Sequence, residues 1–230
     1  LGAGMDTDCG GFMDSKAMEK VIDDTKISGL VDTALIHLFK VQFRLGFADP
    51  DSMVPFAQVG SEVVNTPAHQ QLAREAAEQS LVLLNNDKKN LPWKASALKT
   101  VAVIGRNANA TANMQGNYYG TAPYLISPLD SISKYVKTTF SDGSDVAAAT
   151  ALVAGADAIV LVVGLTSEGQ RPGDETEGHD RTQLTLPDSQ DALITAVVSA
   201  AAKASKSVTL VSMNGGPLDL SASKSNAGVG

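Results

Sequence analysis

The chain has 230 residues, 43% of them hydrophobic, which is enough for one large domain or two small ones with a sizeable core. Its formal net charge of −7 argues against nucleic acid or an anionic membrane as a partner, because both bind basic surfaces, and a neutral or cationic ligand fits better. Cys9 is the only cysteine, so an intrachain disulfide and a cysteine-based zinc site are excluded, and no apolar run reaches the roughly 18 residues that span a bilayer.

The N-terminal part of the sequence predicts a loop followed by helices. Residues 1–11 indicate the end of a strand that turns into a glycine-rich loop, in which Asp6 and Asp8 are expected to be exposed. Between residues 15 and 43, hydrophobic residues recur at spacings of three and four, which predicts two helices with a break near Ser28–Gly29. Residues 47–60 show no such periodicity and contain two prolines, as is typical of a linker.

The next helix has a clear start signal. Thr66 is a suitable N-cap and Pro67 suits the first helical position, where its missing N–H group costs no hydrogen bond. We expect this helix to run to about Ser80 and to be followed by a short buried strand over residues 81–84, Leu-Val-Leu-Leu.

The remainder of the chain alternates strand and helix patterns. Three continuous apolar runs predict strands buried on both faces, at residues 100–105, 156–164 and 207–213. Helical patterns separate them at about 127–136, 145–155 and 188–203. This alternation predicts the α/β class, with a largely parallel sheet and helices on both of its faces.

Charge collects in the loop that follows the second of these strands, Gly164–Arg181. In an open parallel sheet, ligands gather at the carboxyl ends of the strands, which is where this loop begins. Its acidic residues are Glu168, Asp174, Glu175, Glu177 and Asp180, and His179 lies among them. The sequence therefore places the candidate functional site in this loop.

Motifs for nucleotides and metals are absent from these loops. After Gly105 there is neither a dinucleotide-binding nor a phosphate-binding glycine pattern, and the next glycine, Gly116, comes too late to cradle a pyrophosphate. The acidic loop lacks the spacing of a calcium loop, and His179 has no helical histidine partner, so we expect no metal and no cofactor. Two interpretations of the loop stay open: a solvated surface loop, or a carboxylic acid that serves as general acid and base.

A series of motifs in a fixed order carries a resemblance to a known family. The motifs are Ala3-Gly-Met-Asp-Thr-Asp-Cys-Gly10, Thr66-Pro-Ala-His-Gln-Gln-Leu-Ala73, Val101-Ala-Val-Ile-Gly105, Gly116-Asn-Tyr-Tyr-Gly120, Ser127-Pro-Leu129, Glu175-x-Glu177-Gly-x-Asp-Arg181, Leu186-Pro187 and Gly215-Gly-Pro-Leu-Asp219. In combination they resemble glycoside hydrolase family 3, and specifically its plant and fungal β-xylosidase branch.

The resemblance implies a two-domain enzyme, in which a (β/α)8-type barrel precedes an α/β sandwich domain. On this basis residues 1–46 are expected to be the C-terminal remnant of the barrel domain and residues 47–66 a linker. Residues 67–230 are expected to form the sandwich domain, truncated at its C-terminus. The chain starts at Leu1 without a signal peptide pattern, and we expect an upstream part to be missing.

The resemblance also implies a reaction. It is that of a retaining, exo-acting β-glycosidase, here a β-D-xylosidase that hydrolyses xylo-oligosaccharides without cofactor or metal. The family's nucleophilic aspartate lies upstream of these residues, so the isolated chain is expected to be inactive. The acid/base glutamate lies on the loop after the second strand, where Glu175 ranks first, Glu177 second and Glu168 third.

Other residues receive roles from the same resemblance. Asp6 matches a position at the mouth of the barrel, where it either touches substrate or holds its loop. Asp180 and Arg181 are expected to pair and to anchor the acidic loop. Asn109 begins the glycosylation pattern Asn-Ala-Thr, which matters if the protein is secreted, as is usual in the family.

One hypothesis from another class stands beside the enzyme, namely a noncatalytic carbohydrate-binding or interaction module made from the same domain. An in-frame upstream barrel would separate the two. The sugar stays open among xylose, arabinose and glucose, because the selecting loops belong to the barrel, and the oligomeric state stays unknown.

Overall fold

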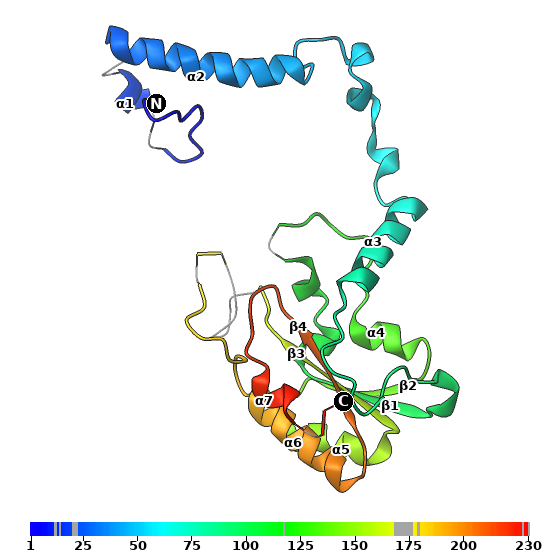
Figure 1. The fold of residues 1–230 in the computed structure, drawn as a ribbon. Coiled ribbons are helices and arrows are strands. Elements are labelled where there is room, and N and C mark those ends of the chain that lie inside the picture. The colour runs from blue at the N-terminus through cyan, green and yellow to red at the C-terminus, as the bar shows by residue number, and fades with distance from the viewer. Residues whose placement is uncertain are drawn as a thin grey trace. The chain divides into compact units, whose positions relative to one another are not determined.

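The computed structural model describes residues 1–11, 13, 15–19, 23–116, 118–167, 177–178, 180–226 and 228–229. The chain divides into two compact units, Leu1–Leu81 and Val82–Gly230, and each is described by itself (Figure 1). The division into barrel remnant, linker and sandwich domain stays a prediction.

The first unit consists of helices and short 3-10 turns. Its α-helices are α1 (Ser15–Glu19), α2 (Thr25–Arg44) and α3 (Pro67–Ser80). Between the last two lie the 3-10 turns η1 (Asp51–Met53), η2 (Pro55–Gln58) and η3 (Ser61–Val63). The segment predicted to be a linker thus contains local turns rather than a longer regular element.

Helix α2 corrects the prediction of a break near Ser28–Gly29, because it continues through both residues. Its start is set by Asp24, whose carboxylate accepts hydrogen bonds from the N–H groups of Lys26 and Ile27 at 2.8 and 3.3 Å. A glycine inside a helix costs only about 1 kcal/mol relative to alanine, which a helix of 20 residues tolerates. The cap therefore decides the boundary, and the glycine does not.

Helix α3 begins as predicted, but the prediction of a strand after it is wrong. The Thr66 hydroxyl accepts a hydrogen bond from the His69 N–H at 3.3 Å, and Pro67 occupies the first turn. Residues 81–84 form no strand, and their side chains are 64–77% exposed. A strand needs a neighbouring backbone for its hydrogen bonds, and none of the four strands in the described part of the chain lies beside this segment.

The second unit is built on a four-stranded parallel sheet. Its strands are β1 (Thr100–Ile104), β2 (Lys137–Ser141), β3 (Ala158–Gly164) and β4 (Val208–Met213), in the spatial order β2-β1-β3-β4. The three apolar strands are confirmed. Strand β2 was not predicted because its sequence, Lys-Thr-Thr-Phe-Ser, is that of a half-exposed edge strand without an apolar run.

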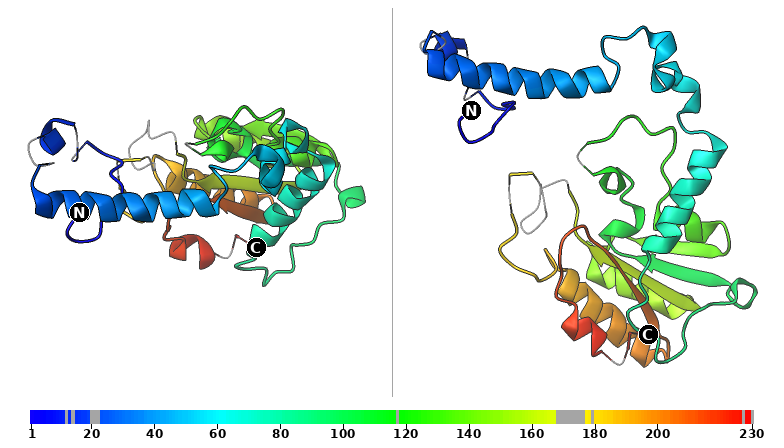
Figure 2. Two further views of the ribbon diagram at one scale, coloured as in Figure 1. Left: turned by 90° about the horizontal axis from the view of Figure 1, so that it is seen from above. Right: turned by 45° about the horizontal axis from the view of Figure 1, so that its top comes forward.

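Helices cover both faces of the sheet. The helices are α4 (Pro128–Ser133), α5 (Val146–Gly155), α6 (Gln190–Lys203) and α7 (Ser221–Lys224), with the 3-10 turns η4 (Ala95–Ala97), η5 (Arg106–Asn109) and η6 (Ala112–Gln115). Helices α5 and α6 lie on one face, and α4 with η5 lies on the other (Figures 1 and 2). The predicted α/β class is confirmed.

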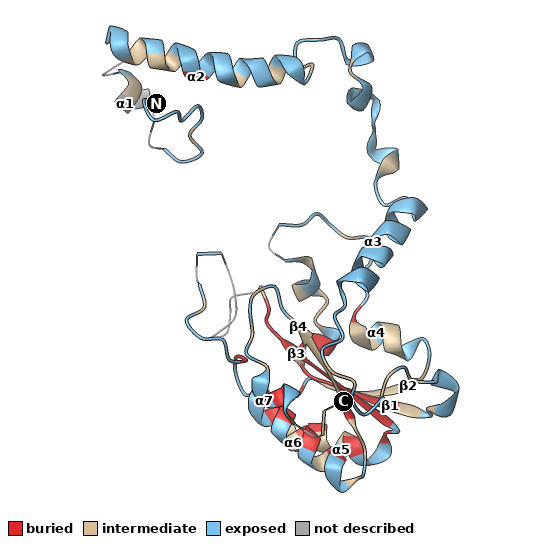
Figure 3. Cartoon of the chain, in the orientation of Figure 1, coloured by how far each residue is buried: buried red, intermediate tan, exposed pale blue. Residues whose placement is uncertain are grey.

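The core follows the alternation of side chains along the strands. Ile104 and Leu161 are fully buried against α5 and α6, whereas their neighbours Val103 and Val162 are fully buried on the opposite face. Burial is concentrated in the central strands β1 and β3 (Figure 3). Each such side chain stabilises the fold by about 1.5–3 kcal/mol, so the sheet is a rigid base for the loops at its carboxyl edge.

Candidate functional site

Three loops leave the sheet at the carboxyl ends of β1, β3 and β4. Gly105 and Gly164 stand at the first two exits, with φ angles of +115° and +137° that favour glycine. A Cβ atom at Gly105 would lie 2.0 Å from the Val162 carbonyl oxygen, and one at Gly164 would lie 1.9 Å from that of Met213. Both loops therefore begin in direct contact with the backbone of the neighbouring strand.

A buried glutamine holds the start of the acidic loop. Gln190, at the start of α6, is 5% exposed, and its Oε1 accepts a hydrogen bond from the Gly164 N–H at 2.9 Å. Its Nε2 donates to the carbonyls of Gly164 and Pro187 at 2.9 and 3.1 Å. The side chain thereby satisfies the backbone at the end of β3 as a further strand would do.

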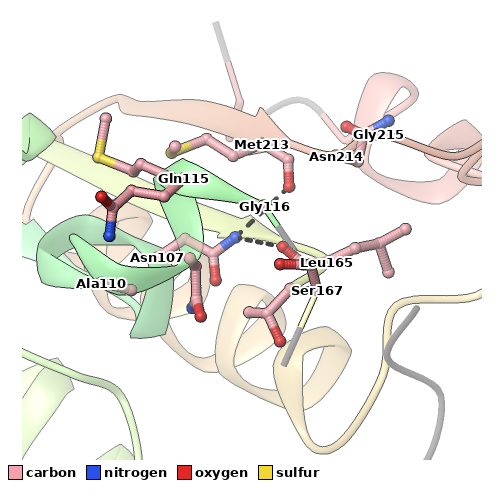
Figure 4. Close-up of a pocket in the computed structure, with 12 residues that line it drawn as sticks. Asn107, Ala110, Gln115, Gly116, Leu165, Ser167, Met213, Asn214 and Gly215 are labelled. Atoms are coloured by element: carbon pink, nitrogen blue, oxygen red, sulfur yellow. Dashed lines mark hydrogen bonds between the residues drawn. The ribbon is translucent and has the colours of Figure 1, made fainter. Parts of the chain in front are cut away.

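A buried asparagine holds the next residue. Asn107 on η5 is 3% exposed, and its Nδ2 donates to the carbonyls of Leu165 at 3.1 Å and Met213 at 3.4 Å (Figure 4). The Leu165 N–H in turn donates to the Met213 carbonyl at 2.9 Å. Among the described residues, the Asn107 Oδ1 has no hydrogen-bond partner. One amide thus joins the residues that follow β1 and β3 to the last residue of β4.

The return end of the loop is held by an arginine. Arg181 donates from Nη1 to the Pro217 carbonyl at 3.0 Å and from Nη2 to the Thr185 carbonyl at 2.6 Å. The anchoring role expected of Arg181 is therefore present. Within the described ranges no ion pair joins it to Asp180, which is exposed, so backbone carbonyls supply the anchor in place of the expected carboxylate.

A pocket of about 420 Å³ lies between these loops (Figure 4). Its described lining is Asn107, Ala110, Asn113, Met114, Gln115, Gly116, Leu165, Thr166, Ser167, Met213, Asn214 and Gly215. None of these side chains carries a charge, and their polar groups are amides and hydroxyls. Such a surface suits a neutral ligand that donates and accepts hydrogen bonds.

Of the candidate proton donors, Glu177 is placed by the structure. It is exposed and accepts a hydrogen bond from the Tyr118 hydroxyl. This hydrogen bond, with a smaller contribution from desolvation, raises the pKa of Tyr118, because the phenolate would lose the bond and face a carboxylate. Glu168 and Glu175 lie outside the described residues, as do Asp174 and His179.

The other predicted site residues lie elsewhere. Asp6, in the first unit, has its carboxylate oxygens 3.1 and 3.2 Å from Nδ1 of His37 on α2, a contact that holds the loop to the helix. Asn109 is exposed, and its Oδ1 accepts a hydrogen bond from the buried Ser127 hydroxyl at 3.1 Å. Neither residue contributes to the pocket lining.

Asn107, Gln190 and Tyr118 were not predicted as site residues from the sequence. Asn107 follows a buried strand by three positions, and Gln190 follows the Leu186-Pro187 motif by three, so both carried a positional signal. Tyr118 belonged to a family motif without an assigned role. The amides were overlooked because an uncharged side chain is not marked by charge clustering.

The described residues hold no group of three or more His, Cys, Asp or Glu side chains that could bind a metal ion. Among those same residues, no helix has both the length and the apolar character needed to cross a membrane.

Comparisons with known proteins agree on one family. Residues 81–229 match the model of the glycosyl hydrolase family 3 C-terminal domain. The chain is 39% identical to beta-D-xylosidase 3 of Arabidopsis thaliana and 39% identical to beta-xylosidase/alpha-L-arabinofuranosidase 2 of Medicago sativa subsp. varia, each over 97% of this chain and 29% of the relative. A solved family 3 exo-beta-xylosidase, XlnD, in complex with a xylobiose aziridine probe, aligns with a TM-score of 0.83 at 30% identity, over 99% of this chain and 29% of that one. The chain thus spans less than a third of the length of these relatives.

Proposed function

This chain belongs to glycoside hydrolase family 3, and we propose that it supplies the acid/base carboxylate of a retaining, exo-acting β-D-xylosidase that acts on xylo-oligosaccharides. The observation that carries the proposal is the anchored acidic loop at the carboxyl edge of the sheet, beside a pocket lined by neutral polar groups. Glu175 is proposed as the proton donor, with Glu177 as the second candidate.

The proposed hydrolysis needs two carboxyl groups with different roles. In a retaining glycosidase one carboxylate attacks the anomeric carbon while a carboxylic acid, about 5–5.5 Å away, protonates the departing glycosidic oxygen. The acid, now ionised, then takes a proton from the water that attacks the glycosyl-enzyme intermediate and so returns to its starting state. We assign the second of these groups to this chain and place the nucleophilic aspartate upstream.

The anchors explain how this chain serves such a role. Gln190 and Asn107 fix the first two residues of the loop, and Arg181 fixes its last. A proton donor has to lie within hydrogen-bond reach of the leaving oxygen. A loop that is fixed at both ends restricts the positions of its side chains, which favours the geometry that a fast reaction requires. No cofactor enters this scheme.

Xylose is proposed as the sugar because the relatives named above are β-xylosidases and the solved relative holds a xylobiose-derived probe. Arabinose remains the second sugar, since one relative also carries the name of an α-L-arabinofuranosidase. We further propose secretion and a part in xylan breakdown. Exposure of Asn109 is compatible with the glycosylation pattern that it begins.

The experiment compares two proteins on one substrate. The full-length protein encoded in the same reading frame is expected to release xylose from xylobiose and from an aryl xyloside, whereas the 230-residue chain alone is expected to release none. Turnover that scales with the amount of purified 230-residue chain would refute the upstream position of the nucleophile. An upstream reading frame without an aspartate-bearing barrel would favour a noncatalytic carbohydrate-binding module instead.

A further inference from the structure

Two loops that are distant in sequence meet above the carboxyl edge of the sheet. Tyr118 lies on the segment that joins η6 to α4, and Glu177 lies on the acidic loop after β3. The Tyr118 hydroxyl donates a hydrogen bond to the Glu177 carboxylate across 59 positions of sequence. Strands β1 and β3, from which the two segments issue, are neighbours in the sheet.

Both loops also line the pocket near their bases. Gln115, the last residue of η6, and Gly116 contribute from the first side, and Thr166 and Ser167 contribute from the acidic loop. Figure 4 shows Gln115, Gly116 and Ser167 around this pocket. The acidic loop is already fixed at Leu165 and at Arg181. A bond between Tyr118 and Glu177 adds a third fixed point four residues before the second anchor.

We propose that Tyr118 is a positioning residue for the acidic loop, and that Glu177 is the point at which the loop is tied, while the proton donor is a different glutamate of the same loop. The inference rests on the proposed function. A carboxylate that accepts a phenolic O–H has one oxygen committed to a protein group, whereas a general acid has to present its own O–H to the leaving oxygen. The same hydrogen bond raises the pKa of Tyr118, because it stabilises the phenol relative to the phenolate.

The test uses the full-length protein, with xylobiose as a substrate with a poor leaving group. Tyr118→Phe removes only the hydroxyl and is expected to lower kcat about tenfold with little change in KM, which corresponds to about 1.4 kcal/mol of transition-state stabilisation. Tyr119→Phe is the matched control. Tyr119 is exposed and adjacent, and among the described residues its hydroxyl shows no hydrogen bond.

Variants of Glu177 distinguish two roles of this residue, namely fixing the loop through Tyr118 and donating a proton to the substrate. Glu177→Ala is expected to lower kcat about as much as Tyr118→Phe, and the double variant no further, because the two changes break one bond. Glu177→Gln keeps an acceptor oxygen at the same distance from the backbone and is expected to restore most of the loss. A loss of more than about a hundredfold in Glu177→Gln on xylobiose, with activity kept on an activated aryl xyloside, would identify Glu177 as the donor and overturn the proposal.

Two further results bear on the hydrogen bond itself. Equal kinetics of Tyr118→Phe and Tyr119→Phe would overturn the positioning role. If the full-length parent cleaves no xyloside, the proposed function fails, and the hydrogen bond is then judged by the alkaline titration of tyrosinate absorbance. The parent should contain a late-ionising tyrosine that is absent from Tyr118→Phe, and identical late phases in both proteins would contradict the bond.

Discussion

Replacement of Gln190 by methionine tests whether one buried amide holds the candidate site together. Methionine fills a similar volume but can neither donate to the two carbonyls nor accept from the Gly164 N–H, so three hydrogen bonds of 2.9–3.1 Å are lost. With about 1 kcal/mol for each bond, and polar groups left buried, we expect the free energy of unfolding to fall by about 3 kcal/mol.

Chemical denaturation of the 230-residue chain measures this change. Trp93 is the only tryptophan and packs against the sheet, so its fluorescence reports unfolding of the second unit. Gln183→Met is the matched control, because Gln183 is exposed in the same region, and we expect a change within about 0.5 kcal/mol. A Gln190→Met variant as stable as this control would refute the reasoning that the side chain replaces a strand.

Three further predictions concern the sheet edge and the acidic loop. Gly164→Ala would drive a Cβ atom into a neighbouring carbonyl at 1.9 Å, so soluble protein should be largely lost, whereas Gly155→Ala, whose Cβ would meet nothing within 4 Å, should purify like the parent. The Asp157 carboxylate accepts hydrogen bonds from the N–H groups of Thr100 and Lys99, and these bonds hold the pKa of Asp157 below its usual value. The ionised carboxylate therefore stabilises the folded state fully above the unfolded pKa of about 3.9. This stabilisation is lost as the pH falls through the lower pKa of the folded state. The difference in Tm between parent and Asp157→Asn should therefore be largest near neutral pH and shrink below about pH 4, and a difference that grows on acidification would contradict this sign. Glu175→Gln in the full-length protein should strongly slow cleavage of xylobiose and affect activated aryl xylosides less, and equal rates of mutant and parent on xylobiose would exclude Glu175 as the acid.

The central strands were predictable because their signal is local. An apolar run that ends in glycine, as at Gly105 and Gly164, indicates a strand buried on both faces whatever its neighbours are. Residues 81–84 have the same apolar character but are exposed in this structure, because strand formation depends on a partner backbone that composition does not reveal. Strand β2 shows the converse, since pairing with β1 places a polar sequence in the sheet.

The candidate site was predictable only in part for a related reason. Clustered carboxylates marked the loop Gly164–Arg181, and the family motifs ranked its glutamates. The contacts that fix it come from positions far away in sequence, such as Asn107 to Leu165 over 58 residues. Spacing along a chain carries no information about such pairs, because the register of β1 against β3 brings them together.

The anchoring side chains Gln190 and Asn107 are amides, which can both donate and accept hydrogen bonds. The end of β3 offers both an N–H donor and a C=O acceptor, and an amide satisfies both at once. A carboxylate at Gln190 could only accept, and a lysine or arginine could only donate, so either would leave a buried backbone group unsatisfied and would itself be a costly buried charge. Neutral anchors also leave the described pocket lining uncharged, so a ligand's hydroxyl groups meet hydrogen-bonding partners without a competing ion. The pocket lining thus supplies neutral hydrogen-bonding groups, while the acidic loop beside it supplies the carboxylates that the proposed acid/base chemistry requires.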